Sequence, residues 1–451
     1  MRRRLKKYFD TQSKKIQLAW RRRILLPLRR RRYEALPTAM ITGTSGKTTT
    51  SRMLAHILKQ SGFTVGLATT DNVDIAGRLI KEGDWAGYWG HHSVLNNPSI
   101  SAAVLETARG GLLTDGLYID RCHVAALLNV GREQIGIDGI DTIEDMAAVK
   151  RQVIEAAQRA VVLNADDPFC CRLIDQFPID RTSIFSFFPD SDPVKLQVSA
   201  GGVAFCLDES GPPLIVRMRG GERRPVVPVA NLPSTFGGVV RHNIANAMAA
   251  AAMAEGLGVE QKAVVAGLTS FHSSLERQLG RFTIVEGYSL TLILDMAVTI
   301  PSAMALVDSL ERVQVSGRRI CMCTTAGNRQ AWHFQDYAKT IAKHFDHFVC
   351  YEHGKYRRGR APGEINNLLK SGLLASGVKS TAIELAGDYE RGLKSTASIA
   401  EAGDLIVLLC SLEGSTIPLI ERAFARHATT RTGRCSLRDP NKDPPTPETV
   451  S

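Results

Sequence analysis

The sequence predicts an α/β protein in which a central P-loop parallel-sheet domain with a β-rich insert precedes a smaller Rossmann-like α/β domain. From Thr38 onward, short apolar runs alternate with segments of helical periodicity, which is typical of a parallel sheet flanked by helices. A glycine-containing loop stands between the first such run and the first such helix. The chain of 451 residues also exceeds the length of about 250 to 300 residues at which single cores stop growing.

The first expected strand is AMIT at residues 39–42, followed by a helix over residues 46–62 that Gly62 closes and by a strand over residues 63–70. Further parallel strands are expected at AAVLET, VAALLNV and RAVVLNA. The stretch from Ser183 to about Pro233 differs, because FSFF, LQVS, VAFCL and LIVRM are separated by Gly, Pro and Asp. We expect these four runs to form an antiparallel insert.

A long alanine-rich helix is expected at RHNIANAMAAAAMAEGLG, and a second alternating region begins near Arg281. Its expected strands are TLILD, ICMCTT, HFVCYE and DLIVLLC. We therefore divide the chain into a basic arm at residues 1–36, a central domain at 37–274 with its insert at about 183–233, a second domain at 275–427 and a disordered polar tail at 428–451.

The net charge of +11 is concentrated in the arm. Residues 1–33 hold 14 Lys and Arg against one acid, whereas the rest of the chain holds 42 bases against 44 acids. As a helix, the arm is basic and amphipathic, which fits an anionic membrane surface, an acidic protein partner, nucleic-acid phosphates, a transit-type presequence or a solvated tail. Because the basicity is confined to the arm and no base-stacking module occurs, we do not expect nucleic acid as the partner of the main body.

Nine cysteines occur at irregular positions, without the spacing of a zinc site or an even disulfide framework. Buried thiols in a reducing compartment fit this pattern. No run of about 18 apolar residues is present, so a membrane-spanning helix is not expected. The predicted location is the cytoplasm, with peripheral attachment to a membrane surface as an option that the arm leaves open.

The most specific motif is TGTSGKTTT at residues 42–50, where a strand passes into a helix. Glycines let the backbone approach a phosphate closely, and a helix N-terminus presents free N–H groups and a positive dipole end. Lys47 can bridge terminal phosphates, and the Thr48 hydroxyl can reach magnesium. We predict a nucleotide-binding loop rather than an ordinary glycine-containing turn, made of Gly43, Thr44, Ser45, Gly46, Lys47, Thr48 and Thr49.

Glu106 ends a predicted strand in VLETARGG. Open α/β sheets bind ligands in the crevice beyond the carboxyl ends of their strands. An acid there can hold a metal that phosphate oxygens already bridge. The alternative is a glutamate that is only solvated.

In these and later motifs, the chain resembles the Mur ligase superfamily, and in particular the Mur-ligase-like half of the cyanophycin synthetases. The motifs follow the family's order as TGTSGKTTT, LETARGG, LLNVGREQIGIDGIDTIEDMAAVK, VVLNADD, RHNIANAMAAAA and LGRF. The segment RGRAPGE, with Arg358, Arg360 and Glu364, continues the likeness. The ATP-grasp half of those synthetases has no counterpart here, so we expect a single-step ligase or one partner of a split system.

The resemblance implies ATP-dependent amide ligation, in which ATP phosphorylates a carboxylate and an amine attacks the acyl phosphate. ATP and Mg²⁺ are the implied cofactors. The implied substrates are an amino acid and a carboxylate or peptide acceptor, with arginine and lysine as the first amines to try. Homo-oligomers are common among relatives of this type.

The resemblance also assigns roles by motif position. Catalytic roles fall on Lys47, Glu106, Lys150 and Arg281, and Lys150 matches a lysine that is carbamylated in several Mur ligases. Metal contacts fall on Thr48, Glu106 and Gln134. Nucleotide contacts beyond the loop fall on Asn243, Arg281 and Asp295, the last two from the second domain. Acceptor contacts fall on Thr107 and Arg109, where a guanidinium can clamp a carboxylate or instead form a surface ion pair.

Three departures from the family pattern bear on activity. The family's Asp-His is here Glu133-Gln134, which replaces an imidazole by a weaker amide ligand. Ser45 stands where the family's loop has asparagine. Val298 and Thr299 stand where the relative has a polar pair that faces the nucleotide. A catalytically impaired nucleotide-binding scaffold that docks through its arm is therefore the alternative to a ligase.

Asn164, Asp166 and Asp167 are expected to act as turn and cap residues.

Overall fold

The computed structural model describes residues 33–132, 135–272, 280–285, 287–409 and 416–429. Most of the predicted basic arm, Glu133 and Gln134, and most of the predicted C-terminal tail lie outside the described residues. The chain divides into two compact units, one made of residues up to Leu232 with His242–Phe271, and one made of Pro233–Arg241 with the residues from His272 onward.

The first unit is built on an 11-stranded sheet of order β11-β10-β9-β8-β7-β6-β1-β5-β2-β3-β4. The seven strands from β9 to β2 in this order run parallel, and antiparallel strands complete both edges. The strands are β1 (Thr38–Thr42), β2 (Val65–Ala68), β3 (Asn72–Ile75), β4 (Arg78–Glu82), β5 (Ala102–Glu106), β6 (Cys122–Leu127), β7 (Ala157–Asn164), β8 (Thr182–Ser186), β9 (Val203–Asp208), β10 (Leu214–Arg219) and β11 (Glu222–Pro228).

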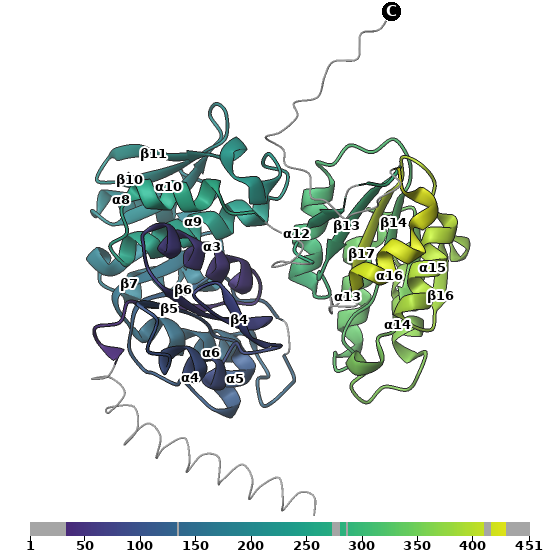
Figure 1. The fold of residues 1–451 in the computed structure, drawn as a ribbon, viewed down its shortest axis with the longest axis horizontal. Helices are drawn as coiled ribbons and strands as arrows, with labels where there is room; N and C mark the ends of the chain where they lie inside the picture. Colours follow the sequence, from purple (N-terminus) through teal and green to yellow (C-terminus); the bar gives the residue numbers. More distant parts are fainter. Residues whose placement is uncertain (1–32, 133–134, 273–279, 286, 410–415, 430–451) are drawn as a thin grey trace, which may run out of the picture. The chain divides into compact units, whose positions relative to one another are not determined.

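Helices cover both faces of this sheet (Figure 1). The helices are α3 (Lys47–Gln60), α4 (Tyr88–Leu95), α5 (Arg109–Thr114), α6 (Ile143–Glu155), α7 (Pro168–Cys171), α8 (Asp192–Ser199), α9 (Arg241–Gly256) and α10 (Gln261–Thr269). Alternate residues of β5 enter opposite cores: Val104 packs with α3, α9 and α10, and Leu105 packs with α4 and α6. Burial on both faces explains why the parallel strands read as continuous apolar runs.

The region expected to be an antiparallel insert instead continues the main sheet. β8 pairs in parallel with β7, and β9 pairs in parallel with β8, so only β10 and β11 are antiparallel. LQVS is not a strand, because it lies in helix α8, which has a proline in its first turn and buries Val194 and Val198 at a spacing of four residues. That spacing and an N-terminal proline are helical signals, and a four-residue apolar run does not reveal them.

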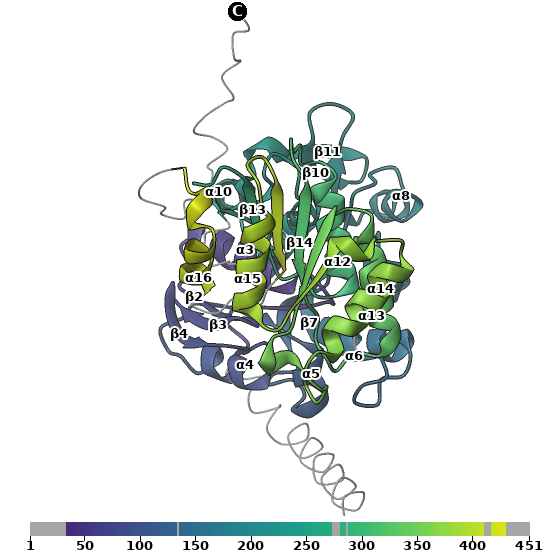
Figure 2. The same cartoon turned by 90° about the vertical axis from the view of Figure 1, so that its right-hand side faces the viewer.

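The second unit contains a six-stranded sheet of order β12-β13-β17-β14-β15-β16, in which only β12 is antiparallel to its neighbour. Its strands are β12 (Thr283–Val285), β13 (Thr291–Asp295), β14 (Arg319–Cys323), β15 (His347–Tyr351), β16 (Ile383–Ala386) and β17 (Leu405–Leu409). Its helices are α12 (Ile300–Leu310), α13 (Ala331–Ala342), α14 (Glu364–Ala375), α15 (Tyr389–Ile399) and α16 (Thr416–Ala423). Figure 2 shows α12, α13 and α14 on one face of this sheet and α15 and α16 on the other.

The described cysteines are free thiols, and all of them except Cys171 are buried, as the sequence predicted. None of the helices in the described part of the chain has the length and apolar character needed to cross a bilayer. The α/β class, the large parallel sheet and the second, smaller sheet agree with the predicted architecture.

Candidate active site

The predicted phosphate loop joins β1 to α3 at the carboxyl edge of the first sheet. Gly46 occupies the N-cap position of α3 with a φ of 81°, a left-handed conformation that glycine adopts without strain. A Cβ atom at Gly46 would lie 2.5 Å from Oδ1 of Asn246. Both the backbone conformation and the close packing therefore require glycine here.

The first turn of α3 has no side-chain cap, unlike α6, where Thr142 and Asp145 form a capping box. The N–H groups of an uncapped first turn, together with the helix dipole, form a natural anion site. The Lys47 ammonium donates to the Thr44 carbonyl over 3.1 Å, so it lies over the same loop. Thr48 and Thr49 are buried in this first turn. The arrangement is suited to binding phosphate.

Asn129 holds the loop in place, a role that the sequence analysis missed. Its Oδ1 accepts from the backbone N–H groups of Thr44 and Ser45 over 2.8 and 2.9 Å, and its Nδ2 donates to the Ser45 carbonyl over 3.2 Å. Asn129 follows β6, which pairs with β1. The available signal was a polar residue at the end of the predicted strand VAALLNV.

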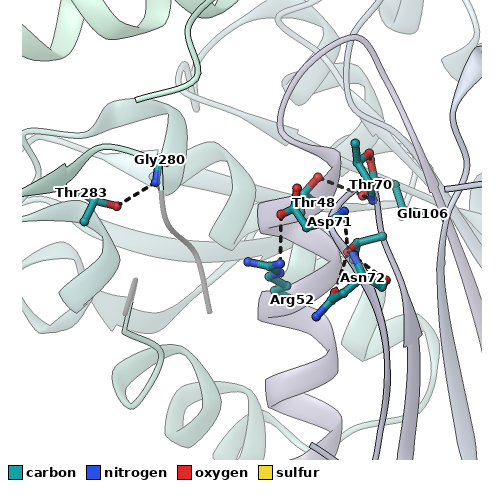
Figure 3. A network of polar contacts seen from close by, with 9 residues as sticks. Thr48, Arg52, Thr70, Asp71, Asn72, Glu106, Gly280 and Thr283 are labelled. Atoms are coloured by element: carbon teal, nitrogen blue, oxygen red, sulfur yellow. Dashed lines mark hydrogen bonds and ion pairs between the residues drawn. The ribbon is translucent and has the colours of Figure 1, made fainter. Parts of the chain in front are cut away.

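The Thr48 hydroxyl donates to Oε2 of Glu106 over 2.9 Å, which joins the helix of the loop to the end of β5 (Figure 3). Glu106 is fully buried and also accepts from Thr70, whose N–H donates to Oε2 over 3.0 Å and whose hydroxyl donates to Oε1 over 2.6 Å. The structure thus brings together two residues that the sequence had assigned to a metal. Thr70, from the loop after β2, is a third participant that the sequence analysis missed.

The loop that carries Thr70 is also tied to α3. Arg52, on the second turn of that helix, donates to Oδ2 of Asp71 over 2.9 Å (Figure 3). Thr48 and Arg52 are one helical turn apart: Thr48 shares Glu106 with Thr70 of this loop, and Arg52 bonds Asp71 of the loop directly. The helix, the loop and the end of β5 therefore form one connected polar network.

His91 contacts the backbone of Glu106. It lies on α4, is almost fully buried, and its Nε2 is 2.8 Å from the carbonyl oxygen of Glu106. Because a carbonyl only accepts, Nε2 carries a hydrogen. Burial lowers the pKa of His91 to about 4. His91 was not predicted from the sequence, since a histidine inside an apolar helix gives no indication of its partner.

Lys150, the residue expected to match a carbamylated lysine, lies on α6 and is buried. Its ammonium donates to the Gly43 carbonyl over 2.9 Å, so it contacts the start of the phosphate loop. Burial, with the nearby charges of Lys47 and Arg109, lowers the pKa of Lys150 to about 7. The amine therefore carries a proton only part of the time near neutral pH.

Thr107 and Arg109, assigned to the acceptor, are both buried just beyond Glu106. The Thr107 hydroxyl donates to the Leu105 carbonyl over 3.3 Å. The Arg109 guanidinium donates to the Ile137 carbonyl and lies 3.5 Å from a carboxylate oxygen of Asp138. In this structure Arg109 anchors the loop after β6 through an ion pair, which was one of the two roles considered for it.

Asn243, expected near the purine, lies in the first turn of α9 and accepts from Nδ2 of Asn246 over 3.1 Å. Oδ1 of Asn246 in turn accepts from the Thr50 hydroxyl of α3 over 3.2 Å. Asn243 is thereby connected to the helix of the phosphate loop.

Asp167 caps α7 and accepts from the Val130 N–H, so it is the cap residue that the sequence predicted.

In the second unit, Asp295 ends β13 and accepts from the Phe282 N–H over 2.6 Å, beside Arg281. Burial raises the pKa of Asp295 to about 6, against the opposing effects of that N–H and of Arg281. Thr299, in the segment that departs from the family pattern, forms a capping box with Ser302 at the start of α12. The roles predicted for Arg281 and Asp295 toward a nucleotide remain predictions.

Within the described ranges, no three His, Cys, Asp or Glu side chains gather in a metal-binding cluster. This does not argue against magnesium, which proteins commonly hold through one or two side chains while the substrate phosphates supply further oxygens. Thr48 and Glu106 provide such a pair, with oxygen donors only. The residues present therefore fit Mg²⁺ bound together with a nucleotide.

Two family models match the chain. The model described as Mur ligase middle domain matches residues 41–254, and the model described as Mur ligase, glutamate ligase domain matches residues 280–412. Together they span the sheets of both units and include the phosphate loop, Glu106, Lys150 and Asp295.

Among named relatives, the cyanophycin synthetase of Trichormus variabilis is 34% identical over 396 residues, which cover 86% of this chain and 42% of the relative. The UDP-N-acetylmuramyl-tripeptide synthetase of Deinococcus radiodurans is 25% identical over 383 residues, which cover 82% of this chain and 71% of the relative. The chain thus spans less than half the length of the cyanophycin synthetases that it matches.

Solved structures share the fold. The MurF ligase of Thermotoga maritima in complex with ADP matches with a TM-score of 0.59 at 18% identity, covering 89% of this chain and 83% of that one. The pseudomurein peptide ligase type C of Methanothermus fervidus matches with a TM-score of 0.57 at 18% identity, covering 86% and 79%. At these identities the likeness establishes the fold alone.

Proposed function

Because the chain belongs to the Mur ligase superfamily, we propose that it is an ATP-dependent ligase that joins a carboxylate to the amine of an amino acid. The observation that carries the proposal is the 2.9 Å contact between the Thr48 hydroxyl and the Glu106 carboxylate, beside an uncapped helix N-terminus. Phosphoryl transfer needs such a phosphate cradle and an adjacent metal ligand. Relatives that match more than four fifths of the chain are named as synthetases and as a ligase, which supports the same reaction class.

The reaction proceeds in two displacements. A carboxylate oxygen of the acceptor attacks the γ-phosphorus of ATP, the bond between that phosphorus and its bridging oxygen breaks, and ADP leaves with the electron pair. The neutral amine nitrogen then attacks the acyl carbon. The bond from that carbon to the phosphate oxygen breaks, inorganic phosphate leaves, and the nitrogen gives up a proton to form the amide.

The chain's own residues would bind and orient the phosphates. The first-turn N–H groups of α3 and the Lys47 ammonium cradle them. Thr48 and Glu106 would hold Mg²⁺, which offsets negative charge on the transferring group. Asn129 and Thr70 keep the loop and the acid in position through the hydrogen bonds described above.

The remaining assignments rest on motif position. We assign Asn243 to the purine, Arg281 to the phosphates and Asp295 to the ribose. Thr107 and Arg109 follow Glu106 directly along the chain, so we assign them to the acceptor side. Lys150, with a pKa of about 7, is the candidate for carbamylation.

The test is ADP release from ATP and Mg²⁺, measured for amino acids in combination with simple carboxylates and aspartyl peptides. We expect release with at least one pair and a loss of about 100-fold in Lys47→Ala, because a positioned cation at the phosphates typically supplies several kcal/mol. Lys59→Ala, which removes an exposed lysine from the last turn of the same helix, is the matched control and should keep full activity. Release that is equal in Lys47→Ala and wild type, or ATP binding without release for any pair, would contradict the proposal.

A further inference from the structure

Helices α15 and α16 lie side by side on one face of the second sheet (Figure 2). A groove with a volume of about 360 Å³ lies between them, within the range of about 300 to 1,000 Å³ that is typical of small-molecule sites. Its lining residues come from α15, from α16 and from the short helix Ala425–His427 that follows. None of these lining residues has a role in the ligation proposed above.

The floor of the groove is apolar. Leu393 and Ala397 lie one turn apart on α15, and Leu419 and Ala423 lie one turn apart on α16. All four contribute to the core on this face of the sheet. Because the alanine side chains end at Cβ, the helices are not fully packed against each other at these positions. The floor can contact an aliphatic group, but the described lining residues include no aromatic ring on which a nucleobase could stack.

The rim of the groove is positively charged. Lys394, Arg422 and Arg426 line it together with a single acid, Glu390, which leaves an excess of two positive charges. Lys394 pairs with Glu390 over 3.0 Å, and both side chains are exposed. An exposed pair of this kind contributes little stability, so it can yield to a ligand. Arg422 is exposed and forms no hydrogen bond or ion pair with another described residue.

Arg426 joins the two sides of the groove. It donates from Nη2 to the Ala397 carbonyl in the last turn of α15, and from Nε to Nε2 of His427 over 3.0 Å. A cation is stabilised by the free carbonyls at a helix C-terminus, so this guanidinium is held in position by the protein itself. Among the described residues it has no further partner, which leaves Nη1 available to a ligand.

We propose that this groove binds a small aliphatic phosphate monoester, with its phosphate on Arg422 and Arg426 and its organic group on the apolar floor. A phosphate monoester carries a charge of about −1.5 to −2 near pH 7, which complements the excess of two positive charges. Guanidinium groups also bind phosphate oxygens through paired hydrogen bonds. The inference goes beyond the proposed ligation and does not depend on it.

The direct test is isothermal titration calorimetry of the full chain with glycerol 3-phosphate, in the presence of ADP and Mg²⁺ to occupy the phosphate loop. We expect binding at least about tenfold tighter than that of glycerol, which lacks the charge. It should also be tighter than that of succinate, whose two charges are separated. Equal affinity for glycerol, or tighter binding of succinate, would overturn the proposal.

Variants locate the site. Arg422→Glu should weaken binding by about tenfold or more, because an attraction becomes a repulsion. Lys379→Glu makes a matched charge change at an exposed position that precedes β16, and should change the affinity less than about twofold. Ala423→Leu lengthens a side chain of the floor without changing the charge, and should weaken binding by about fivefold or more. Unchanged affinity in folded Arg422→Glu and Ala423→Leu would overturn the proposal.

A phosphate-loop variant separates this groove from the candidate active site. Lys47→Ala should bind glycerol 3-phosphate as the wild type does, because Lys47 lies in the first unit and does not line the groove. Binding that falls in Lys47→Ala but persists in Arg422→Glu would assign the phosphate to the loop after β1 and overturn the proposal. Binding that depends on Arg422, in a chain that releases no ADP with any substrate pair, would refute ligation and leave this site standing.

The same phosphate chemistry occurs in a soluble compound and in the headgroup of phosphatidic acid, and vesicles distinguish the two sources. The measurement is flotation with phosphatidylcholine vesicles that contain or lack phosphatidic acid. Only binding that Arg422→Glu reduces is informative, since the basic residues 1–36 can attract anionic lipid by themselves. Such binding without affinity for glycerol 3-phosphate would identify a lipid headgroup, and the reverse would identify a soluble ligand. A lack of glycerol 3-phosphate binding, together with vesicle binding that is absent or equal in Arg422→Glu and wild type, would overturn the proposal.

Discussion

Thr48 donates its hydroxyl hydrogen to Oε2 of Glu106 over 2.9 Å. The threonine oxygen is the donor in this hydrogen bond, so the bond does not use its lone pairs, and the carboxylate is the acceptor. Thr70 occupies both oxygens of the same carboxylate from the other side. Glu106 is therefore oriented by the protein's own hydrogen bonds, and the metal-binding role proposed for it would require no change of rotamer.

The first prediction concerns this carboxylate. Glu106→Gln should raise the Mg²⁺ concentration needed for nucleotide binding and ADP release by about 10- to 100-fold. The reason is that an amide is a poorer ligand for a hard cation and carries no charge. The measurement is a Mg²⁺ titration of ATP binding. Glu82→Gln, at an exposed position on β4, is the matched control and should behave as wild type. An identical Mg²⁺ titration in wild type and Glu106→Gln would contradict the assignment.

The parallel strands and the phosphate loop could be predicted from sequence because each has a local signal. Apolar runs such as AAVLET read as strands buried on both faces, and the glycine spacing before Lys47 marks the strand-to-helix turn. Glu106 was also predictable, since it directly follows the apolar run of β5. Each of these predictions depended on residues within about ten positions of one another.

The supporting residues could not be predicted in this way. Asn129, Thr70 and His91 reach the site from the segment after β6, from the loop after β2 and from α4, so their roles depend on strand order and on helix placement. The insert was also misread, because LQVS is too short to separate a strand from the helix that buries Val194 and Val198. Strand order and burial direction are properties of the assembled sheet, and a linear pattern does not specify them.

Alanine variants of Gly46 and Gly62 separate the effect of backbone strain from the effect of close packing. Gly46→Ala places a Cβ on a backbone with φ 81° and 2.5 Å from Asn246. Gly62→Ala places one at φ 86°, just beyond the C-terminus of the same helix, with nothing within 4 Å. The Gly62 variant should lower the free energy of unfolding by about 1 to 2 kcal/mol and keep ATP binding.

The Gly46 variant should cost more and should also lose ATP binding, since its extra methyl group intrudes on the phosphate loop. Denaturant unfolding and ATP titration of both variants provide the measurement. Equal stability loss with ATP affinity retained in both variants would show that the loop does not require glycine for close packing.

Lys150 should be chemically reactive near neutral pH. Its pKa of about 7 makes a large fraction of the amine neutral, and a neutral amine can attack carbon dioxide to form a carbamate. We expect a carbamate signal in carbon-13 NMR after incubation with labelled bicarbonate, growing as the pH rises through 7. Lys150→Arg keeps a donor for the Gly43 carbonyl and should lose the signal, whereas Lys59→Arg should keep it. A spectrum unchanged by Lys150→Arg would exclude this modification.

His91 should make the fold sensitive to acid. Its pKa is about 4 in the folded chain and near 6.5 when exposed, so the unfolded chain binds the proton more strongly between these values. Its contribution to stability is complete above pH 6.5 and is lost progressively as the pH falls toward 4, by up to about 3.5 kcal/mol at about 1.4 kcal/mol per pKa unit. His91→Gln keeps an N–H donor for the Glu106 carbonyl without this titration, and it should flatten the pH dependence of denaturant unfolding between pH 6.5 and 4. His92→Gln replaces the exposed neighbour on the same helix and should leave that dependence as in wild type. If both variants and the wild type lose stability in parallel, the acid sensitivity arises elsewhere, and His91 is not held neutral by its burial beside Glu106.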